Sequence, residues 1–347
     1  MGRTAIVKDK RYLRHYTGEY HPENHHRLEV IYEMLEEDGM KGKFREIAPR
    51  AATREELEMV HTSRYVDQIA ATSGRDYTMV DPDTHTSAES WEVAKLAVGG
   101  LLHLVDGVMK GEVQNGFALI RPPGHHAESY RGMGFCIFNN VAIAAKYARE
   151  KYKIEKVLIV DWDLHHGNGT QNSFYEDPLV LYFSAHQFPY YPGSGSIGEI
   201  GKGKGTGFSV NVPLSGGQGD AEYIQIFKEL LCPIAEEFAP QLVLVSAGFD
   251  IYFQDPLGAM DVTPGGFYLM TEIMMEIAKK CCHDRIIMVL EGGYHLAGLR
   301  ESVKASLKRL GDMEYEGVNE NEKREGVGVK EIIRSVKSVQ KKFWKSL

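Results

Sequence analysis

Cysteine is scarce in this chain of 347 residues, which contains only Cys136, Cys232, Cys281 and Cys282. These four are too few for the disulfide framework of a small secreted domain, and none forms a Cys-x-x-Cys pair. Long apolar runs are also missing, since no stretch of about 18 uncharged apolar residues, the length a membrane-spanning helix needs, occurs. We therefore expect a soluble cytoplasmic protein with no membrane partner.

Positive charge is outnumbered, because 40 Lys and Arg residues face 48 Asp and Glu residues. The formal net charge of -8 gives no overall attraction to nucleic acid, so direct nucleic acid binding is not expected, although a local basic patch stays open. No Pro/Gly/Ser-rich linker and no fixed-period repeat divides the chain. The simplest interpretation is one domain spanning residues 1–347, as a monomer or a homo-oligomer.

Short runs of branched apolar residues indicate buried strands, because each is too short for a helix. These runs are Phe117–Ile120, Val157–Val160, Leu179–Phe183, Leu242–Val245 and Ile286–Leu290. Segments with helical spacing lie between them, at Trp91–Met109, Asn140–Tyr152, Ala221–Phe238 and Phe267–Cys281. The alternation predicts an α/β fold in which helices cover a parallel sheet. After a charged segment at 311–328, the spacing in Val329–Trp344 predicts an amphipathic helix that docks back.

Polar clusters follow four of the predicted strands. Ile120 leads into Arg-Pro-Pro-Gly-His-His, and Val160 leads into Asp-Trp-Asp-Leu-His-His. Val245 leads into Ser-Ala-Gly-Phe-Asp, and Leu290 leads into Glu-Gly-Gly-Tyr-His. Because ligands of an open parallel sheet bind beyond the carboxyl ends of its strands, we expect the four clusters to converge in one site.

One of these clusters has the pattern of half a metal site. Asp161, Asp163 and His165 stand at every second position, so an extended strand end would point all three side chains to one side. With Asp250 from another strand, Asp163 and His165 give two carboxylates and one imidazole, which suits a catalytic zinc with a position left for water. Any one of these residues could equally cap a helix or form a buried hydrogen bond. Three such residues in register at a strand end favour the metal site over these structural roles.

The other clusters offer proton carriers and a hydrogen-bond donor. His125 and His126 follow a restrained Pro-Pro-Gly turn and are candidate proton carriers. Asp161 is available to orient one imidazole, and Asn168 to orient the other. Tyr294 follows two glycines and could donate to a developing oxyanion, although a rim aromatic is an alternative interpretation of a lone tyrosine.

Two further motifs do not indicate a site. The glycine-rich segment 201–207 has the composition of a phosphate cradle, but it runs into a predicted strand rather than a helix, so we interpret it as a hairpin-like surface turn. The His-dense segment His21–Arg27 precedes a helical pattern and shows no carboxylate at metal-ligand spacing. We expect it to be a rim loop rather than a second metal site.

The motifs RPPGHHA, GFCIFNN, VDWDLHHGNGT, SAGFD and EGGYH together resemble those of the histone deacetylase superfamily, in the family's order. The resemblance runs from about His21 to about Gly311, and its roughly thirty positions make it far more specific than one short motif. It implies the arginase-deacetylase fold, a single domain with a central parallel sheet and helices on both faces. Asn168 stands where the first class carries Asp, so a class II-like bacterial or archaeal histone deacetylase or acetylpolyamine amidohydrolase is implied. An amide lacks charge, so the pKa of His126 should be lower than beside a carboxylate.

Carried over position by position, the resemblance implies one Zn2+ ion, or Fe2+, bound by Asp163, His165 and Asp250. It implies His126 as general base and then acid with His125 as its electrostatic partner, Tyr294 as the carbonyl-polarising residue, and Asp161 and Asn168 as further catalytic residues. Substrate contacts are implied for Gly134, Phe135, Tyr191, Leu257, Gly292 and Gly293, with Arg27 and Cys136 near an inner acetate cavity. Potassium is implied at an inner site of Asp161, Asp163, His165, Ser184 and Ala185, and at an outer site of Phe174, Asp177, Val180 and Phe208, mostly through backbone carbonyls.

The resemblance implies a hydrolase that removes acetyl or other acyl groups from lysine side chains of proteins or peptides by metal-activated water. Acetylpolyamines are the alternative substrates, but Leu257 offers no charge to a polyamine where the family member specialised for acetylated spermidine carries a glutamate. A two-manganese ureohydrolase of the same fold would need more carboxylates around Asp250 than the sequence provides. The second alternative, a module that binds acyl-lysine without turnover, would usually have lost a ligand or Tyr294.

Overall fold

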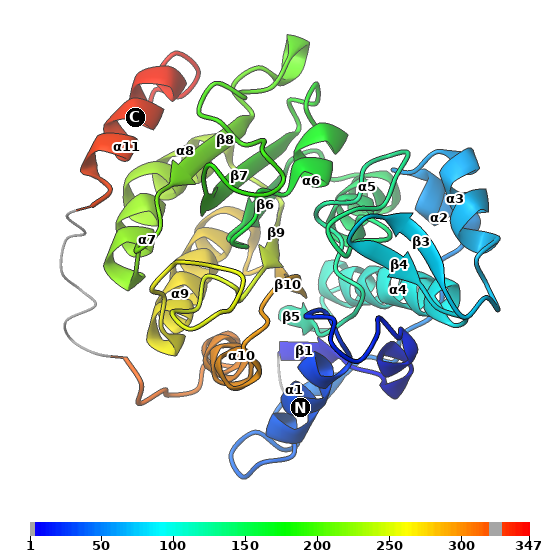
Figure 1. The fold of residues 1–347 in the computed structure, drawn as a ribbon. Coiled ribbons are helices and arrows are strands. Elements are labelled where there is room, and N and C mark those ends of the chain that lie inside the picture. The colour runs from blue at the N-terminus through cyan, green and yellow to red at the C-terminus, as the bar shows by residue number, and fades with distance from the viewer. Residues whose placement is uncertain (1–3, 319–327) are drawn as a thin grey trace.

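An eight-stranded sheet forms the centre of the computed structural model, which describes residues 4–318 and 328–347 (Figure 1). Its strand order is β2-β1-β5-β10-β9-β6-β7-β8, and all neighbouring strands are parallel. These strands are β1 Thr4–Val7, β2 Arg45–Glu46, β5 Asn115–Ala118, β6 Val157–Asp161, β7 Val180–Gln187, β8 Ser209–Leu214, β9 Leu242–Ala247 and β10 Ile286–Leu290. The predicted α/β class with a parallel sheet is confirmed.

Helices occupy most of the segments between the strands. The α-helices are α1 His26–Leu35, α2 Arg54–Glu58, α3 Ser63–Ala70, α4 Ser90–Met109, α5 Asn140–Tyr152, α6 Asn168–Ser173, α7 Asp220–Ile226, α8 Cys232–Phe238, α9 Pro264–Cys282, α10 Leu296–Leu310 and α11 Lys330–Gln340. Two 3-10 helices, η1 Lys10–Arg14 and η2 Gly203–Gly205, and a π-helical turn, η3 Phe227–Leu231, complete the described helices.

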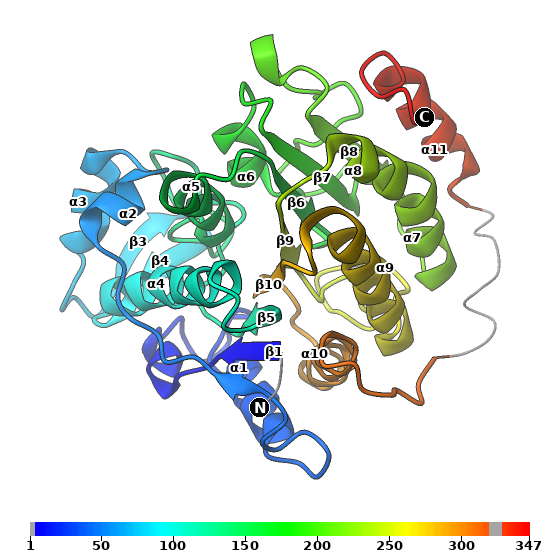
Figure 2. The same cartoon turned by 180° about the vertical axis from the view of Figure 1, so that it is seen from behind.

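Helices cover both faces of the sheet (Figures 1 and 2). α4 and α5 pack together and contact strands of the centre of the sheet, and α9 and α10 pack together against the same strands. Because both faces are covered, β5, β6, β9 and β10 are buried along their whole length. This burial explains why β6, β9 and β10 appear in the sequence as continuous apolar runs rather than as alternating patterns. β5 begins with Asn115 and Gly116, so it starts two residues before the apolar run predicted at Phe117–Ile120.

The structure departs from the sequence interpretation in several elements. The helix expected over Ala221–Phe238 is divided into α7, η3 and α8, because a π-helical turn interrupts it. The interpretation of 201–207 as a hairpin-like turn is wrong, since the strand that follows, β8, is parallel to β7. A short antiparallel pair, β3 Thr78–Asp81 and β4 Thr84–Thr86, was not predicted, because strands this short with few apolar residues carry little apolar signal.

At the C-terminal end, α11 packs on β8. The side-chain amide of Gln340 donates to the Ser209 carbonyl at 3.0 Å, and the Trp344 indole N–H donates to the Gly207 carbonyl at 3.0 Å. Of the charged segment at 311–328, residues 319–327 lie outside the described part of the chain. Among the described residues, no helix combines the length and apolar character needed to cross a membrane.

Candidate functional site

The four polar clusters meet at one edge of the sheet because the strands that carry them are neighbours. These strands lie in the order β5-β10-β9-β6, and each cluster follows the carboxyl end of its strand. In the sheet register, Asp161 at the end of β6 pairs with Ser246 in β9. Leu290 at the end of β10 pairs with Ala247 at the end of β9. Parallel strands in register therefore bring the four loops to one place.

Asp163, His165 and Asp250 form a compact cluster in which one potential ligand atom of each residue lies within 4.8 Å of the others. The Nδ1 atom of His165 lies 3.3 Å from Oδ1 of Asp163 and 3.1 Å from Oδ2 of Asp250. The period-2 argument that led to this cluster is wrong, because β6 ends at Asp161 and the chain then bends. Each aspartate accepts a hydrogen bond from the backbone N–H two residues on, the Asx geometry that forms such bends.

The charges in this cluster suit a divalent cation. Burial, followed by the neighbouring Asp163 carboxylate, raises the pKa of Asp250 to about 7. Burial alone would lower the pKa of His165, but its hydrogen bonds with Asp163 and Asp250 raise it to about 9. Two buried carboxylates facing one imidazole need a positive charge between them, and this donor set fits Zn2+ or Fe2+.

His125 and His126 lie side by side next to this cluster, with ring centroids 4.0 Å apart. The Nδ1 atom of His125 lies 3.1 Å from Oδ2 of Asp161. Burial alone would lower the pKa of His125, but the charges of Asp163 and Asp161 raise it to about 10. Burial, and then the positive charge of His125, lower the pKa of His126 well below its ordinary value. The first ring therefore favours the protonated form, and the second favours the neutral form that accepts a proton.

Asn168, the first residue of α6, orients the second imidazole. Its Oδ1 atom lies 2.8 Å from Nδ1 of His126. Its Nδ2 group donates to Oε1 of Glu128 at 2.6 Å, which fixes the amide with its carbonyl towards the imidazole. Nδ1 of His126 therefore carries the proton of this hydrogen bond, and Nε2 is left as the basic nitrogen.

Tyr294 is held from three directions. Its backbone N–H donates to Oδ2 of Asp255 at 2.6 Å, an interaction that the sequence did not reveal. The guanidinium carbon of Arg27 lies 5.0 Å from the centre of the tyrosine ring, and Phe135 meets the ring edge-on at 5.9 Å. Burial raises the pKa of Tyr294 well above its ordinary value, so the hydroxyl keeps its proton as a hydrogen-bond donor.

Glu291, directly after β10, was also missed by the sequence reasoning. Its carboxylate accepts hydrogen bonds from the backbone N–H groups of Gly124 at 2.7 Å and His125 at 3.2 Å. The sequence does show a carboxylate beside the Gly-Gly-Tyr motif. The backbone N–H groups that it binds lie more than a hundred residues away in the chain, so the sequence does not reveal this pairing. Glu291 therefore fixes the backbone that carries the tandem histidines.

A second buried carboxylate, Glu23, pairs with the fully buried guanidinium groups of Arg27 and Arg121. Arg27 also donates to the backbone carbonyl of Gly293 at 2.7 Å. Cys136 lies nearby in the interior, with its thiol close to His125 and Glu291. The ion-pair network therefore supports the turn that carries Tyr294 from behind.

Residues predicted to contact substrate lie around the histidines. A Cβ atom at Gly134 would lie 2.3 Å from the His126 ring, so the backbone of this residue touches the imidazole. Tyr191 meets His126 edge-on with centroids 5.1 Å apart. Tyr190, which the sequence did not single out, stacks on His165 at 5.6 Å and donates its hydroxyl to the Leu257 carbonyl at 3.0 Å.

The β3–β4 hairpin and the glycines after β10 also contact residues of the candidate site. Asp83 accepts from the Gly134 backbone N–H at 3.0 Å, and the Thr84 hydroxyl accepts from the Phe135 N–H at 2.9 Å. Gly292 donates its N–H to Oδ2 of Asp163 at 2.8 Å, so it packs against the carboxylate cluster. Substrate contact stays a prediction for all six residues, Gly134, Phe135, Tyr191, Leu257, Gly292 and Gly293.

The residues predicted to bind potassium fall in two places. At the inner place, Ser184 lies level with Asp161 across β6 and β7, and Ala185 follows it in β7. At the outer place, the Phe174 carbonyl accepts from the Asp177 N–H, the Asp177 carbonyl accepts from the Val180 N–H, and the Phe208 carbonyl accepts from the Tyr182 N–H. The Asp177 side chain pairs with Arg149. Both potassium sites stay predictions.

The segment His21–Arg27 lies partly at the rim and partly inside. His21 contacts Phe135 edge-on at 4.7 Å, whereas Arg27 is fully buried. The expectation that no carboxylate lies at ligand spacing to these histidines is wrong, because α1 places Oε2 of Glu29 2.6 Å from Nδ1 of His26.

Known proteins match this chain along most of its length. Residues 21–310 match the family model of the histone deacetylase domain. Histone deacetylase 15 of Arabidopsis thaliana is 41% identical over 360 residues, which cover 99% of this chain and 63% of that protein. A probable deacetylase of Archaeoglobus fulgidus is 38% identical over 99% of both chains. Polyamine deacetylase HDAC10 of Danio rerio is 40% identical over 92% of this chain and 48% of its own length.

The crystal structure of the HDA15 HD domain matches the fold with a TM-score of 0.92 and 41% identity, covering 99% of this chain and 95% of that chain. The match of the family model and these similarities extend over the strands and loops that build the candidate site. The chain therefore belongs to the histone deacetylase family of hydrolases.

Proposed function

We propose that this protein is a zinc-dependent amidohydrolase that removes acetyl or other acyl groups from lysine side chains of proteins or peptides. The observation that carries the proposal is the cluster of Asp163, His165 and Asp250, which lies beside the tandem histidines at the carboxyl edge of the sheet. In the proposal these three residues hold one Zn2+ ion, with Fe2+ as the alternative, and potassium binds at the inner and outer places described above.

The bound metal would supply a Lewis acid and a lowered pKa for water. His126, held neutral and with Nε2 free, accepts a proton from the attacking water and returns it to the leaving amine. His125, paired with Asp161, keeps a positive charge next to the developing oxyanion. Tyr294, whose hydroxyl stays protonated, donates a hydrogen bond to that oxyanion.

Acyl-lysine is the preferred substrate class in this proposal because Leu257, which the family resemblance places at the mouth of the tunnel, is apolar. The backbone carbonyl of Leu257 accepts a hydrogen bond from the Tyr190 hydroxyl. An apolar residue there packs against the aliphatic lysine chain and offers no charged contact to a polyamine. Phe135 and Tyr191 are the proposed aromatic walls of the acyl-lysine tunnel.

Acetylpolyamines are the second candidate, and one observation favours them. Asp81 and Asp83 lie at the β3–β4 hairpin, and burial followed by the Asp83 carboxylate raises the pKa of Asp81. A pair of acidic groups beside Gly134 would attract a secondary ammonium. The name of the zebrafish relative, a polyamine deacetylase, agrees with this candidate.

The deciding experiment compares kcat/KM for an acetyl-lysine peptide with kcat/KM for acetylputrescine and acetylspermidine under identical zinc loading. The proposal predicts the higher value for the peptide. A preference of tenfold or more for the polyamines would overturn the substrate assignment but not the amidohydrolase assignment. Binding of acyl-lysine peptide without any turnover of either substrate would favour the non-catalytic alternative.

A further inference from the structure

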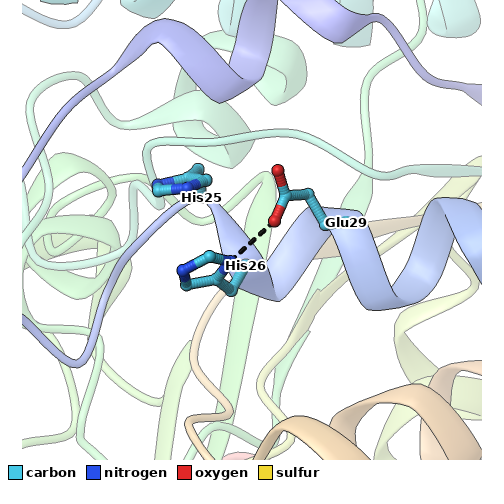
Figure 3. Close-up of side chains that lie close together, drawn as sticks. All are labelled: His25, His26 and Glu29. Carbon is cyan, nitrogen blue, oxygen red and sulfur yellow. Dashed lines mark hydrogen bonds and ion pairs between the residues drawn. The ribbon is translucent and has the colours of Figure 1, made fainter. Parts of the chain in front are cut away.

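Another group of potential metal ligands, apart from those in the candidate site, lies on the outer surface at the start of α1. His25, His26 and Glu29 each offer one ligand atom within 4.8 Å of the other two. Figure 3 shows the two imidazole rings and the carboxylate gathered at the first turn of the helix. The proposed hydrolysis uses none of these three side chains.

The helix itself creates this arrangement. α1 begins at His26, and His25 already has a helical backbone with φ -64° and ψ -25°. Glu29 therefore follows the two histidines by four and three residues, the two spacings that place side chains on one helix face. Asn24 fixes the turn, because its Oδ1 accepts from the His26 N–H at 3.0 Å and its Nδ2 donates to the His21 carbonyl at 2.8 Å.

The ligand atoms lie near enough to one another to share one metal ion after small side-chain rotations. Nδ1 of His26 lies 2.6 Å from Oε2 of Glu29, and the centroids of the two imidazoles are 4.1 Å apart. Two ligand atoms on one tetrahedral zinc ion are roughly 3.4 Å apart, given bonds of about 2.1 Å. The side chains of His26 and Glu29 are 55% and 39% exposed, so they have room for the small rotations required.

The ligand types of this group also favour binding of a transition-metal ion. Two imidazoles and one carboxylate bind transition-metal dications such as Zn2+, Ni2+ or Cu2+, rather than Mg2+ or Ca2+, which prefer oxygen ligands. A dication would take the place of the hydrogen bond between His26 and Glu29.

We propose that His25, His26 and Glu29 form a second metal site, separate from the candidate catalytic cluster, that binds a Zn2+-like dication and holds the first turn of α1. The turn carries Arg27, whose side chain points inward to the Gly293 carbonyl. Zinc at the surface would therefore stabilise the helix that supports the Tyr294 turn from behind.

The test counts zinc on chelator-treated protein that has been dialysed to equilibrium against Zn2+, by elemental analysis. Wild-type protein is expected to bind two zinc ions per chain, and Glu29→Gln and His25→Ala are expected to bind one. Glu33→Gln, which changes an exposed glutamate one helical turn further along α1, is the matched control and should bind two.

The same variants are compared by thermal unfolding. Zinc beyond the first equivalent should raise the Tm of wild-type and Glu33→Gln protein but not that of Glu29→Gln. One zinc ion in wild-type protein, or equal zinc content and equal Tm shifts in Glu29→Gln and Glu33→Gln, would overturn the second site. Deacetylation by Glu29→Gln at one equivalent of zinc reports separately on the proposed function.

Discussion

The partner of His126 gives the sharpest test of how the tandem histidines divide their work. Asn168 presents a neutral oxygen 2.8 Å from Nδ1 of His126, so changing it to aspartate would place a negative charge about 4 Å from the imidazolium charge. At an effective dielectric constant of about 20, this attraction is worth about 4 kcal/mol, or about 3 pKa units. The change alone is ambiguous, because Oε1 of Glu128 lies 2.6 Å from Nδ2 of the amide and two carboxylates would then share a proton.

The informative protein is therefore the double variant Asn168→Asp/Glu128→Gln, with Glu128→Gln as its control. A raised pKa of His126 means that its proton-accepting form appears only at higher pH. The acidic limb of the profile of kcat/KM against pH should therefore move up by about two to three units in the double variant and stay in place in the control. The assay is hydrolysis of an acetyl-lysine peptide at fixed zinc loading. An unmoved acidic limb in a folded double variant would refute the assignment of His126 as the base.

Three further substitutions test the remaining parts of the site. Asp250→Ala should bind one zinc ion fewer than wild-type protein and lose nearly all turnover, because it removes one of the three protein ligands of the catalytic cluster; a zinc content equal to that of wild-type protein, measured by elemental analysis, would contradict the ligand set. Tyr294→Phe should keep the metal but lower kcat by about 10²–10³, the range for one oxyanion donor, and an unchanged kcat would exclude that role. Glu23→Gln should lower the free energy of unfolding by about 3–5 kcal/mol, because it leaves Arg121 and Arg27 buried without their carboxylate. Urea titration at neutral pH measures this change. A loss of under about 1 kcal/mol would contradict the importance of the ion pairs. Burial alone would raise the pKa of Glu23, but the two guanidinium groups lower it to about 2. The ionised Glu23 carboxylate therefore stabilises the folded state at neutral pH, and this stabilisation is lost only as the pH falls from the usual carboxylate range towards 2.

The position of the site could be predicted from the sequence because two signals coincide. The central strands are buried on both faces and so appear as continuous apolar runs, and the chemistry follows directly at their carboxyl ends. The grouping of Asp163 with His165 was found by a wrong argument, since the chain bends after Asp161 instead of staying extended. An Asx bend and an extended strand end can each bring two side chains that are two positions apart, such as those of Asp163 and His165, into one site. The spacing of the residues alone therefore does not show which of the two backbone conformations is present.

The supporting carboxylates could not be predicted because their partners are distant backbone groups. Glu291 binds the N–H groups of a loop after another strand, and Asp255 binds the N–H of Tyr294. Neither pairing leaves a spacing pattern in the sequence. The contact between Glu29 and His26 was missed for a different reason. The exact start of α1 decides whether Glu29 faces the histidines, and helix ends are hard to locate from sequence. The single-domain organisation of residues 1–347 stays a prediction.

The central claim is that Asp163, His165 and Asp250 hold a metal ion on which amide hydrolysis depends. The direct measurement is acetate release from an acetyl-lysine peptide by chelator-treated protein before and after zinc is restored. The account predicts no release above background without metal and recovery of turnover as zinc is added. Undiminished release by protein shown to be metal-free would contradict it.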